Sequence, residues 1–191
     1  MNSFVNSLLN EITPTEIITL WFSEAGKKFW YNATSEMDKE LREKYSDIFH
    51  AAMRDRLEQW QDTPEGSLAL VIVLDQFPLN MYRGEAESYS GEARSREVAA
   101  AAIARGFDEA LIDEQKAFLY LPYMHSENLD DQDRAIELFT QAGLMENLKW
   151  AEHHREIVRR FGRFPHRNDM LGRKFTPEEE DYMKTEQAFH G

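Results

Sequence analysis

The chain of 191 residues contains no cysteine. This absence excludes disulfides, thiolate zinc sites and a cysteine nucleophile, and it suits the reducing cytoplasm, where we expect the protein to reside. Long apolar runs are missing as well, because none approaches the ~18 residues that a membrane-spanning helix needs. The run LALVIVL (68–74) is too short, and the N-terminus lacks the basic start and apolar core of a secretion signal. We therefore expect no membrane association.

Positive charge is also scarce, with 22 Lys and Arg against 35 Asp and Glu and a net charge of −13. A face that binds nucleic acid needs clustered positive charge, so nucleic acid is not an expected partner. The hydrophobic content of 42% and the aromatic content of 12% exclude intrinsic disorder. The length suits one folding unit, and we expect a single soluble helical domain over residues 1–191.

Three segments carry the same signal for the start of a helix. TPTE (13–16), TPEG (63–66) and TPEE (176–179) place threonine at the N-cap and proline at the first helical position. The threonine oxygen accepts a free backbone N–H, and proline has no N–H to leave unpaired. In the first and third segments, glutamate three residues after the threonine predicts a capping box.

Helical periodicity predicts the remaining architecture. SEMD (35–38) begins a long helix whose apolar stripe runs from Leu41 to Trp60. The apolar segment SLALVIVLDQF (67–77) has no partner strand elsewhere, so we interpret it as a central helix. Further helices, each closed by glycine, are expected at REVAAAAIARG (96–106), DDQDRAIELFTQAG (130–143) and LMENLKWAEHHREIVRRFG (144–162). The fold class is therefore all-α, with antiparallel helical pairs joined by short loops.

The segment LDQFPLNMYRG (74–84) places a carboxylate at the end of an apolar helix. Asp75 follows the apolar run, and Pro78 then disturbs or ends the helix. An unpaired buried carboxylate is strongly destabilising, so Asp75 needs a partner. Arg83 is the nearest candidate in sequence, and an arginine from residues 155–173 is the distant one. The alternative to a binding role is an internal ion pair that ties helices together.

The segment FLYLPYMHSENLDDQ (118–132) breaks an aromatic-rich helix at Pro122. His125 and Glu127 follow at the break, where freed backbone groups bond to side chains or to a ligand. These two residues can act as an acid–base pair. The alternative is structural: a serine or asparagine caps the next helix, and the histidine is buried with its hydrogen bonds satisfied.

The segment AEHHREI (151–157) does not predict a metal site. Adjacent histidines on a helix point about 100° apart, because an α-helix has about 3.6 residues per turn. The spacing matches neither the HExxH zinc motif nor the paired Glu-x-x-His pattern of di-iron bundles. We therefore expect no metal and no cofactor, and we keep His154 as a candidate ligand-binding residue.

The segment FGRFPHRN (161–168) lies in a region of opposite charge to the rest of the chain. Residues 149–174 hold eight Lys and Arg against three Asp and Glu, a local net charge of +5. Gly162 and Pro165 prevent the helix from continuing, so the arginines lie on a loop. Their planar guanidinium groups suit carboxylate and phosphate oxygens. The alternative is a solvated surface whose arginines pair with acidic residues of the same chain.

These motifs, in this order, resemble a bacterial helical family catalogued as domain of unknown function 924. The likeness runs from LWF (20–22) to LGRKFTPEE (171–179). It implies a tetratricopeptide-like helical fold and supplies no activity. The family's characteristic residues correspond here to Asp75, Gln76, Pro78, Asn80, Arg83, His125, Ser126, Glu127, His154, Gly162, Arg163, Pro165, His166, Arg167, Asn168, Gly172 and Arg173. The chain departs from the family pattern at Leu79, where arginine is usual, and at Gly91, where an acidic residue is usual.

Two functional hypotheses follow. The first is a polar site for a small anion, a phosphate or a carboxylate, formed where the segments DQFP, MHSE and GRFPHRN converge. Whether this site catalyses a reaction stays open. Its candidate catalytic residues are Asp75, His125, Glu127 and His166, and its candidate ligand-binding residues are Arg83, His154, Arg163, Arg167, Asn168 and Arg173. The second is a tetratricopeptide-like module that docks an acidic peptide or a partner protein.

A third interpretation has no ligand: the motif residues form a buried hydrogen-bonded network that specifies the fold. The expected partners are thus an anionic small molecule or an acidic peptide. The sequence predicts no oligomeric state.

Overall fold

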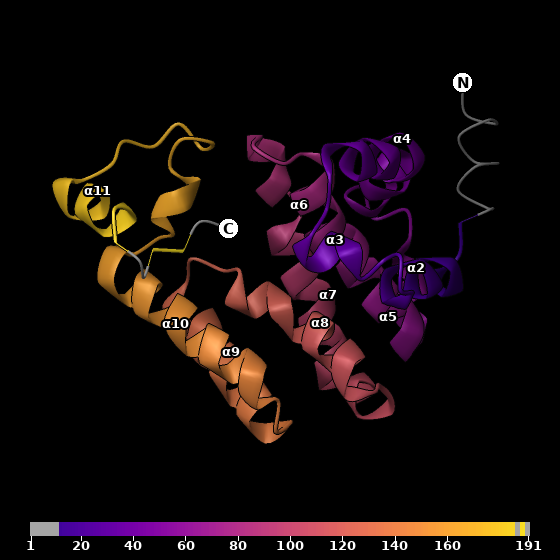
Figure 1. Ribbon diagram of the computed structural model, residues 1–191. Coiled ribbons are helices and arrows are strands. Elements are labelled where there is room, and N and C mark those ends of the chain that lie inside the picture. Colours follow the sequence, from indigo (N-terminus) through magenta and orange to yellow (C-terminus); the bar gives the residue numbers. More distant parts are fainter. Residues whose placement is uncertain (1–11, 186–187, 190–191) are drawn as a thin grey trace. The chain divides into compact units, whose positions relative to one another are not determined.

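The computed structural model describes residues 12–185 and 188–189, and over these residues the regular structure consists of helices without a strand (Figure 1). The predicted all-α fold class is confirmed. The chain divides into two compact units, the first formed by the residues up to Arg83 with Glu87–Pro122, and the second by Gly84–Ala86 with the residues from Tyr123 on. The expectation of one domain over residues 1–191 stays a prediction, since two such units can belong to one domain.

The α-helices of the first unit are α2 (Pro14–Phe22), α3 (Lys28–Tyr31), α4 (Ser35–Ala52), α5 (Pro64–Val71), α6 (Phe77–Met81), α7 (Glu92–Ala104) and α8 (Asp113–Met124), whose last two residues belong to the second unit. Those of the second unit are α9 (Leu129–Gln141), α10 (Met145–Phe161) and α11 (Pro177–Met183). Of the described helices, none combines the length and the apolar character that crossing a bilayer requires.

The three predicted threonine caps are present at the starts of α2, α5 and α11. The capping box is complete only at α11, where Glu179 accepts the N–H of Thr176 at 2.7 Å. At α2 the carboxylate of Glu16 instead accepts from Lys44 Nζ at 3.0 Å and Tyr45 Oη at 3.3 Å. The predicted first capping box is therefore wrong, because side chains of α4 supply other donors to this glutamate.

The apolar stripe that the sequence predicted from Leu41 to Trp60 extends beyond the end of α4. This helix begins after the N-cap Thr34 and ends at Ala52. Asp55 adopts a left-handed conformation with φ of 57°, which ends the helical path. Leu57 and Trp60 are buried nevertheless, because the following turns return them to the core. A continuous helix to Trp60 was a wrong expectation, although the stripe identified these core residues correctly.

The apolar segment 67–77 is helical, as predicted. Within it, α5 continues through a π-helical turn (Ile72–Gln76) into α6. Pro78 has no N–H to bond to the carbonyl of Leu74 four residues earlier, so the wider turn occurs where an α-helical bond is impossible. Gly91 lies against this carbonyl, and a Cβ at that position would be 2.0 Å from the oxygen. No side chain fits at Gly91 without a backbone shift.

In the second unit, α9 and α10 form an antiparallel pair (Figure 1). The turn between them passes through Gly143 with φ of 69°, and α10 ends at Gly162 with φ of 71°, as the glycine signals predicted. After Gly162 the chain forms a loop before α11. The hydrophobic core of the second unit contains Ile157, Val158, Phe164 and Tyr182, with Phe161, Met183, Ala188 and Phe189 packed against them. The likeness to tetratricopeptide repeats stays a prediction.

Candidate functional site

In the first unit, the π-helical turn carries Asp75. This side chain is 1% exposed and accepts a hydrogen bond from Gln76 Nε2 at 2.6 Å. Asn80 Nδ2 donates to the carbonyl oxygen of Gln76 at 3.1 Å, four residues earlier. The polar groups of the LDQFPLN segment therefore bond to one another where the helix widens.

Arg83, the predicted neighbour of Asp75, bonds to other residues of the first unit. Its Nε donates to Asp38 Oδ2 at 2.8 Å, and its Nη2 donates to Asn80 Oδ1 at 2.9 Å. The predicted Asp75–Arg83 pair is therefore wrong. Asp38 lies in the first turn of α4, where a carboxylate also interacts favourably with the helix N-terminus.

In the second unit, the turn between α8 and α9 is held by a glutamine that the sequence did not single out. Buried Gln132 donates through Nε2 to the carbonyl oxygens of Met124 at 2.7 Å and Ser126 at 2.6 Å. Asn128 caps α9 by accepting the N–H of Asp130 at 2.7 Å, which agrees with the structural alternative that a serine or asparagine of this segment caps the helix. These bonds fix the segment that carries the two candidate residues His125 and Glu127.

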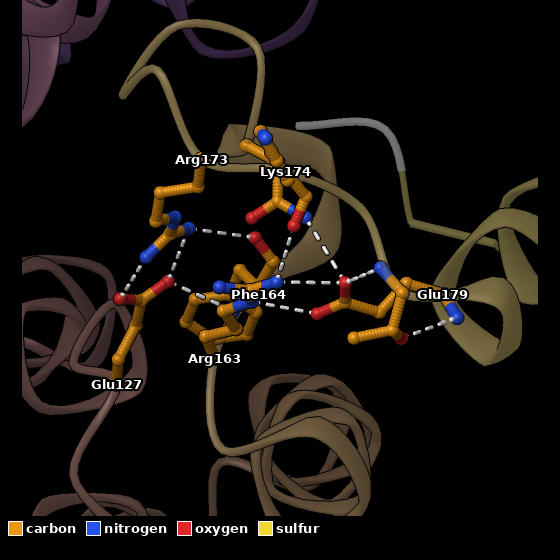
Figure 2. A network of polar contacts seen from close by, with 8 residues as sticks. Glu127, Arg163, Phe164, Arg173, Lys174 and Glu179 are labelled. Atoms are coloured by element: carbon orange, nitrogen blue, oxygen red, sulfur yellow. Dashed lines mark hydrogen bonds and ion pairs between the residues drawn. The ribbon is translucent and has the colours of Figure 1, made fainter.

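Glu127 links this turn to the loop that follows α10 (Figure 2). Arg173 binds both carboxylate oxygens, at 2.7 and 2.9 Å, and the N–H of Phe164 donates to Oε1 at 2.8 Å. Burial opposes the charge of Glu127, but these donors outweigh burial and lower its pKa. Glu127 is thus a carboxylate at neutral pH, held by an arginine 46 residues away in sequence.

Arg163 is paired with Glu179 at the start of α11, and Figure 2 shows this second pair beside the first. Its Nε and Nη2 donate to the two carboxylate oxygens at 2.6 and 2.8 Å, and Nη2 also donates to the carbonyl oxygen of Lys174 at 2.8 Å. Asn168 Nδ2 donates to Glu179 at 3.3 Å. Arg163 is the main cause that lowers the pKa of Glu179 to about 2, against the effect of burial.

A surface hollow of about 350 Å³ opens beside this pair. It is lined by Arg160, Phe161, Arg163, Thr176, Glu178 and Glu179. Arg160 Nε donates to Glu178 at 2.9 Å, so each arginine of the hollow faces a glutamate of α11. A ligand carboxylate here would have to compete with these two glutamates.

His154, on the buried side of α10, is held in the neutral state. Its Nδ1 lies 2.8 Å from the carbonyl oxygen of Trp150, which can only accept, so Nδ1 carries the proton. Burial is the main cause that lowers the pKa of His154 to about 3, and the positive charge of Arg167 contributes.

His166, on the loop after α10, is also neutral. Burial, followed by Arg167, lowers its pKa to about 3. Within the described part of the chain, the buried polar atoms without a hydrogen-bond partner include His166 Nδ1, Asn168 Oδ1 and Arg173 Nε. Buried polar atoms are nearly always hydrogen-bonded in folded proteins, so a group of such atoms within eight residues is unusual.

Arg167, on the same loop, is 5% exposed. Its Nη2 donates to the carbonyl oxygen of His125 at 3.0 Å, and its guanidinium lies over the ring of Phe164 at 4.7 Å from the centroid. It therefore places a buried positive charge beside the turn and the loop.

The structure thus gathers most of the candidate residues in the second unit. These are His125, Glu127, His154, Arg163, His166, Arg167, Asn168 and Arg173. Asp75 and Arg83 belong to the first unit. Whether the two groups form one site stays a prediction. Glu179 and Gln132 were missed as site residues, although the capping-box position of Glu179 was a usable signal, because it directs the carboxylate back towards the preceding loop.

Over the residues that the structure describes, no group of three His, Asp or Glu side chains is placed to hold a metal ion.

The fold and the polar segments define an all-α protein whose second unit carries an arginine-rich loop between α10 and α11. The chain belongs to the family described as "Bacterial protein of unknown function (DUF924)", whose model matches residues 17–187. No curated protein matches the chain. It is similar to the solved structure of the protein of unknown function ATU0120 from Agrobacterium tumefaciens, with 40% identity and a TM-score of 0.84. That match covers 90% of this chain and 96% of that chain. The resemblance proposed from the motifs is confirmed.

Proposed function

We propose that the second unit binds a small anion, a phosphate or a carboxylate, at the cationic loop (residues 163–173). The observation that carries this proposal is the set of buried polar atoms without partners on His166, Asn168 and Arg173. Leaving a buried donor or acceptor unpaired costs about 1–3 kcal/mol. The Nε–H of Arg173, and a protonated Nδ1 of His166, are donors for ligand oxygens, and Asn168 Oδ1 accepts from a ligand hydroxyl.

The surrounding charges support an anion over a cation. Glu127 and Glu179 each hold one arginine of the loop by two hydrogen bonds, which fixes the loop before any ligand arrives. Arg167 adds a buried positive charge that helps to lower the pKa of the neighbouring His166. The same field favours a negative charge. A bound anion would raise the pKa of His166, so binding is expected to strengthen as the pH falls.

Binding is better supported than catalysis. A general acid or base works best with a pKa near the operating pH. Arg173 keeps Glu127 ionised, and burial with Arg167 brings the pKa of His166 to about 3. In the unliganded protein, neither group is therefore poised to transfer protons near neutral pH. The proposed site is limited to the second unit, and a contribution of Asp75 and Arg83 to the same site stays a prediction from the sequence.

The test is thermal denaturation in inorganic phosphate and in acetate, with ionic strength matched by sodium chloride. At about ten times the Kd, a ligand adds about 1.4 kcal/mol and raises Tm by roughly 3–6 °C. The variant His166→Phe keeps a ring and removes Nδ1, so we expect it to lose most of the shift. His153→Phe is the matched control and should keep it. If neither anion raises the Tm of the unmodified protein, the ligand-free network is favoured and the proposal fails.

A second candidate function, docking of an acidic peptide, is favoured by one observation. Trp150 on α10 is 55% exposed, and Met145 on the same helix is 58% exposed, whereas Trp21 and Trp60 are buried. Exposed tryptophan is enriched in protein interfaces. A titration of glutamate-rich peptides, followed by tryptophan fluorescence, should give a saturable change that Trp150→Phe removes. A change that persists in this variant would contradict a role for α10.

A further inference from the structure

The surface hollow beside the start of α11 is lined by charges of both signs. Its lining residues are Arg160, Phe161, Arg163, Thr176, Glu178 and Glu179, and we call it the paired-charge hollow. The charged side chains of this lining, two arginines and two glutamates, sum to zero. Its volume of about 350 Å³ lies within the range of ~300–1,000 Å³ that small-molecule sites occupy. The hollow therefore has room for a small organic molecule and no net charge that selects an anion or a cation.

The two ion pairs of the hollow differ in how much of their bonding capacity they use. Arg163 and Glu179 form the deeper pair, in which both carboxylate oxygens accept hydrogen bonds (Figure 2). Arg160 and Glu178 form the outer pair, which is exposed to solvent and joined by one bond, from Nε to Oε1 at 2.9 Å. That bond leaves the two Nη nitrogens of Arg160 as donors and Oε2 of Glu178 as an acceptor. The outer pair can therefore bind two further charges and keep its own bond.

Aromatic rings restrain the arginine of the outer pair. The guanidinium of Arg160 lies over the ring of Phe161, 4.7 Å from its centroid, and 5.9 Å from that of Tyr182. These two rings pack against each other with their centroids 5.0 Å apart. A cation over an aromatic face is held by electrostatic attraction. A restrained arginine loses less conformational entropy when it binds a ligand, so the outer pair is partly organised for binding.

A ligand with a single charge gains little in this hollow. A carboxylate is attracted by Arg160 and repelled by Glu178, and an ammonium group meets the reverse. A dipolar ion meets opposite charge at both ends when its carboxylate lies at Arg160 and its ammonium group at Glu178. In an α-amino acid both groups are attached to one carbon, so they lie about as close together as the charges of a hydrogen-bonded ion pair. This geometry matches the outer pair.

We propose that the paired-charge hollow binds a free α-amino acid with an apolar side chain. The carboxylate accepts from the Nη nitrogens of Arg160 and from the hydroxyl of Thr176, whose oxygen already accepts the N–H of Glu179 at 3.2 Å. The ammonium group donates to Oε2 of Glu178, and the side chain lies against Phe161. The buried atoms without partners that support the proposed function do not line this hollow, so either site can exist without the other.

The test is isothermal titration calorimetry of the full chain at pH 7 and constant ionic strength with leucine, isocaproate and isoamylamine. These molecules share one branched side chain, and the second and third lack the ammonium group and the carboxylate of leucine, respectively. Leucine should bind about fivefold more tightly than either analogue, because each analogue loses one solvent-exposed ion contact. ε-Aminocaproate, whose two charges are far apart, should bind no better than the analogues with a single charge. An analogue that binds as tightly as leucine, or a leucine titration without binding, would overturn the inference.

Two variants assign the contacts. Glu178→Gln removes the partner of the ammonium group, so leucine and isocaproate should then bind equally. Arg160→Gln removes the partner of the carboxylate, so leucine and isoamylamine should then bind equally. The matched control is Arg159→Gln, because Arg159 forms an exposed pair with Glu156 on α10 and does not line the hollow. This control should keep the preference for leucine in full.

The ion pairs that these variants break are exposed and contribute little to stability, so all three variants should fold, which helical circular dichroism verifies. If Glu178→Gln or Arg160→Gln keeps the full preference for leucine, the assigned contacts are wrong and the inference fails. If Arg159→Gln loses the preference as well, binding follows the charge of α10 rather than the hollow, which also contradicts the inference. Either failure leaves the anion site standing, because phosphate binding at the cationic loop is measured separately.

Discussion

The substitution Glu179→Gln removes one negative charge from the second unit and little else. Glutamine has nearly the same shape and can still accept the N–H of Thr176, so the helix cap of α11 is kept. What is lost is the paired charge opposite Arg163, whose Nε and Nη2 bind the carboxylate at 2.6 and 2.8 Å. The variant therefore measures the buried ion pair itself.

The magnitude follows from the pKa of Glu179. Arg163 is the main cause that lowers this pKa from 4.5 to about 2. One pKa unit corresponds to about 1.4 kcal/mol, which gives about 3 kcal/mol at neutral pH. The Glu179 side chain is 2% exposed, whereas that of Arg163 is 26% exposed, and solvent at the arginine weakens the pair. We expect Glu179→Gln to lower the free energy of unfolding by about 2–3 kcal/mol at pH 7.

The pH dependence gives an independent check. Because the pKa of Glu179 is depressed in the folded state, its contribution is complete above pH 4.5 and is lost as the pH falls towards about 2. The difference between the unmodified protein and the variant should shrink by about 1 kcal/mol at pH 4 and should mostly vanish by about pH 2.

Urea denaturation followed by circular dichroism measures these differences. Glu178→Gln is the matched control, because Glu178 pairs with Arg160 in solvent, with side chains 61% and 44% exposed. Such an exposed pair contributes under about 1 kcal/mol. The reasoning is refuted if Glu179→Gln costs no more than Glu178→Gln at pH 7, or if its effect is the same at pH 7 and pH 4.

Three further outcomes are expected. Glu127→Gln weakens the bonds to Arg173 and should lower the free energy of unfolding in urea by about 1–2 kcal/mol at pH 7, and an unchanged midpoint would contradict this. Gly91→Ala places a Cβ against the carbonyl of Leu74 and should lower the free energy of unfolding by about 2 kcal/mol. An unchanged stability of this variant would show that the π-helical turn can shift at little cost. The pKa of His154, lowered by burial to about 3, lets only the unfolded state take up a proton below about pH 6.5. Stability should then fall as the pH drops from 6.5, and His154→Phe should flatten this fall between pH 7 and pH 5 by up to about 1.4 kcal/mol per pH unit.

The helices could be predicted because their signals are local. The threonine caps and the glycines at positions 143 and 162 act through the backbone of neighbouring residues, and each lies where the sequence indicated. The end of α4 could not be predicted. Its apolar stripe continues past Asp55, which adopts a left-handed conformation. A glycine at this position would have indicated such a conformation and the end of the helix, whereas an aspartate does not.

The partners of the arginines could not be predicted for a different reason. The chain offers 35 acidic residues to 22 basic ones, so composition does not select a pair. Arg173 binds Glu127 and Arg83 binds Asp38, at separations of 46 and 45 residues, and only the packing of helices sets such contacts. The motifs singled out these arginines, but they did not distinguish a guanidinium group that could bind a ligand from one that already holds a carboxylate of the same chain.

Binding of an anion at the cationic loop is tested most directly by nitrogen-15 NMR of the histidine side chains during a titration with inorganic phosphate at pH 7 and constant ionic strength. If phosphate binds there, the His166 Nδ1 resonance should show a saturable shift, because this buried atom gains a hydrogen-bond partner. His50, in α4 of the first unit, serves as the reference and should not move. A His166 resonance that shifts no more in phosphate than in chloride would contradict anion binding at this loop.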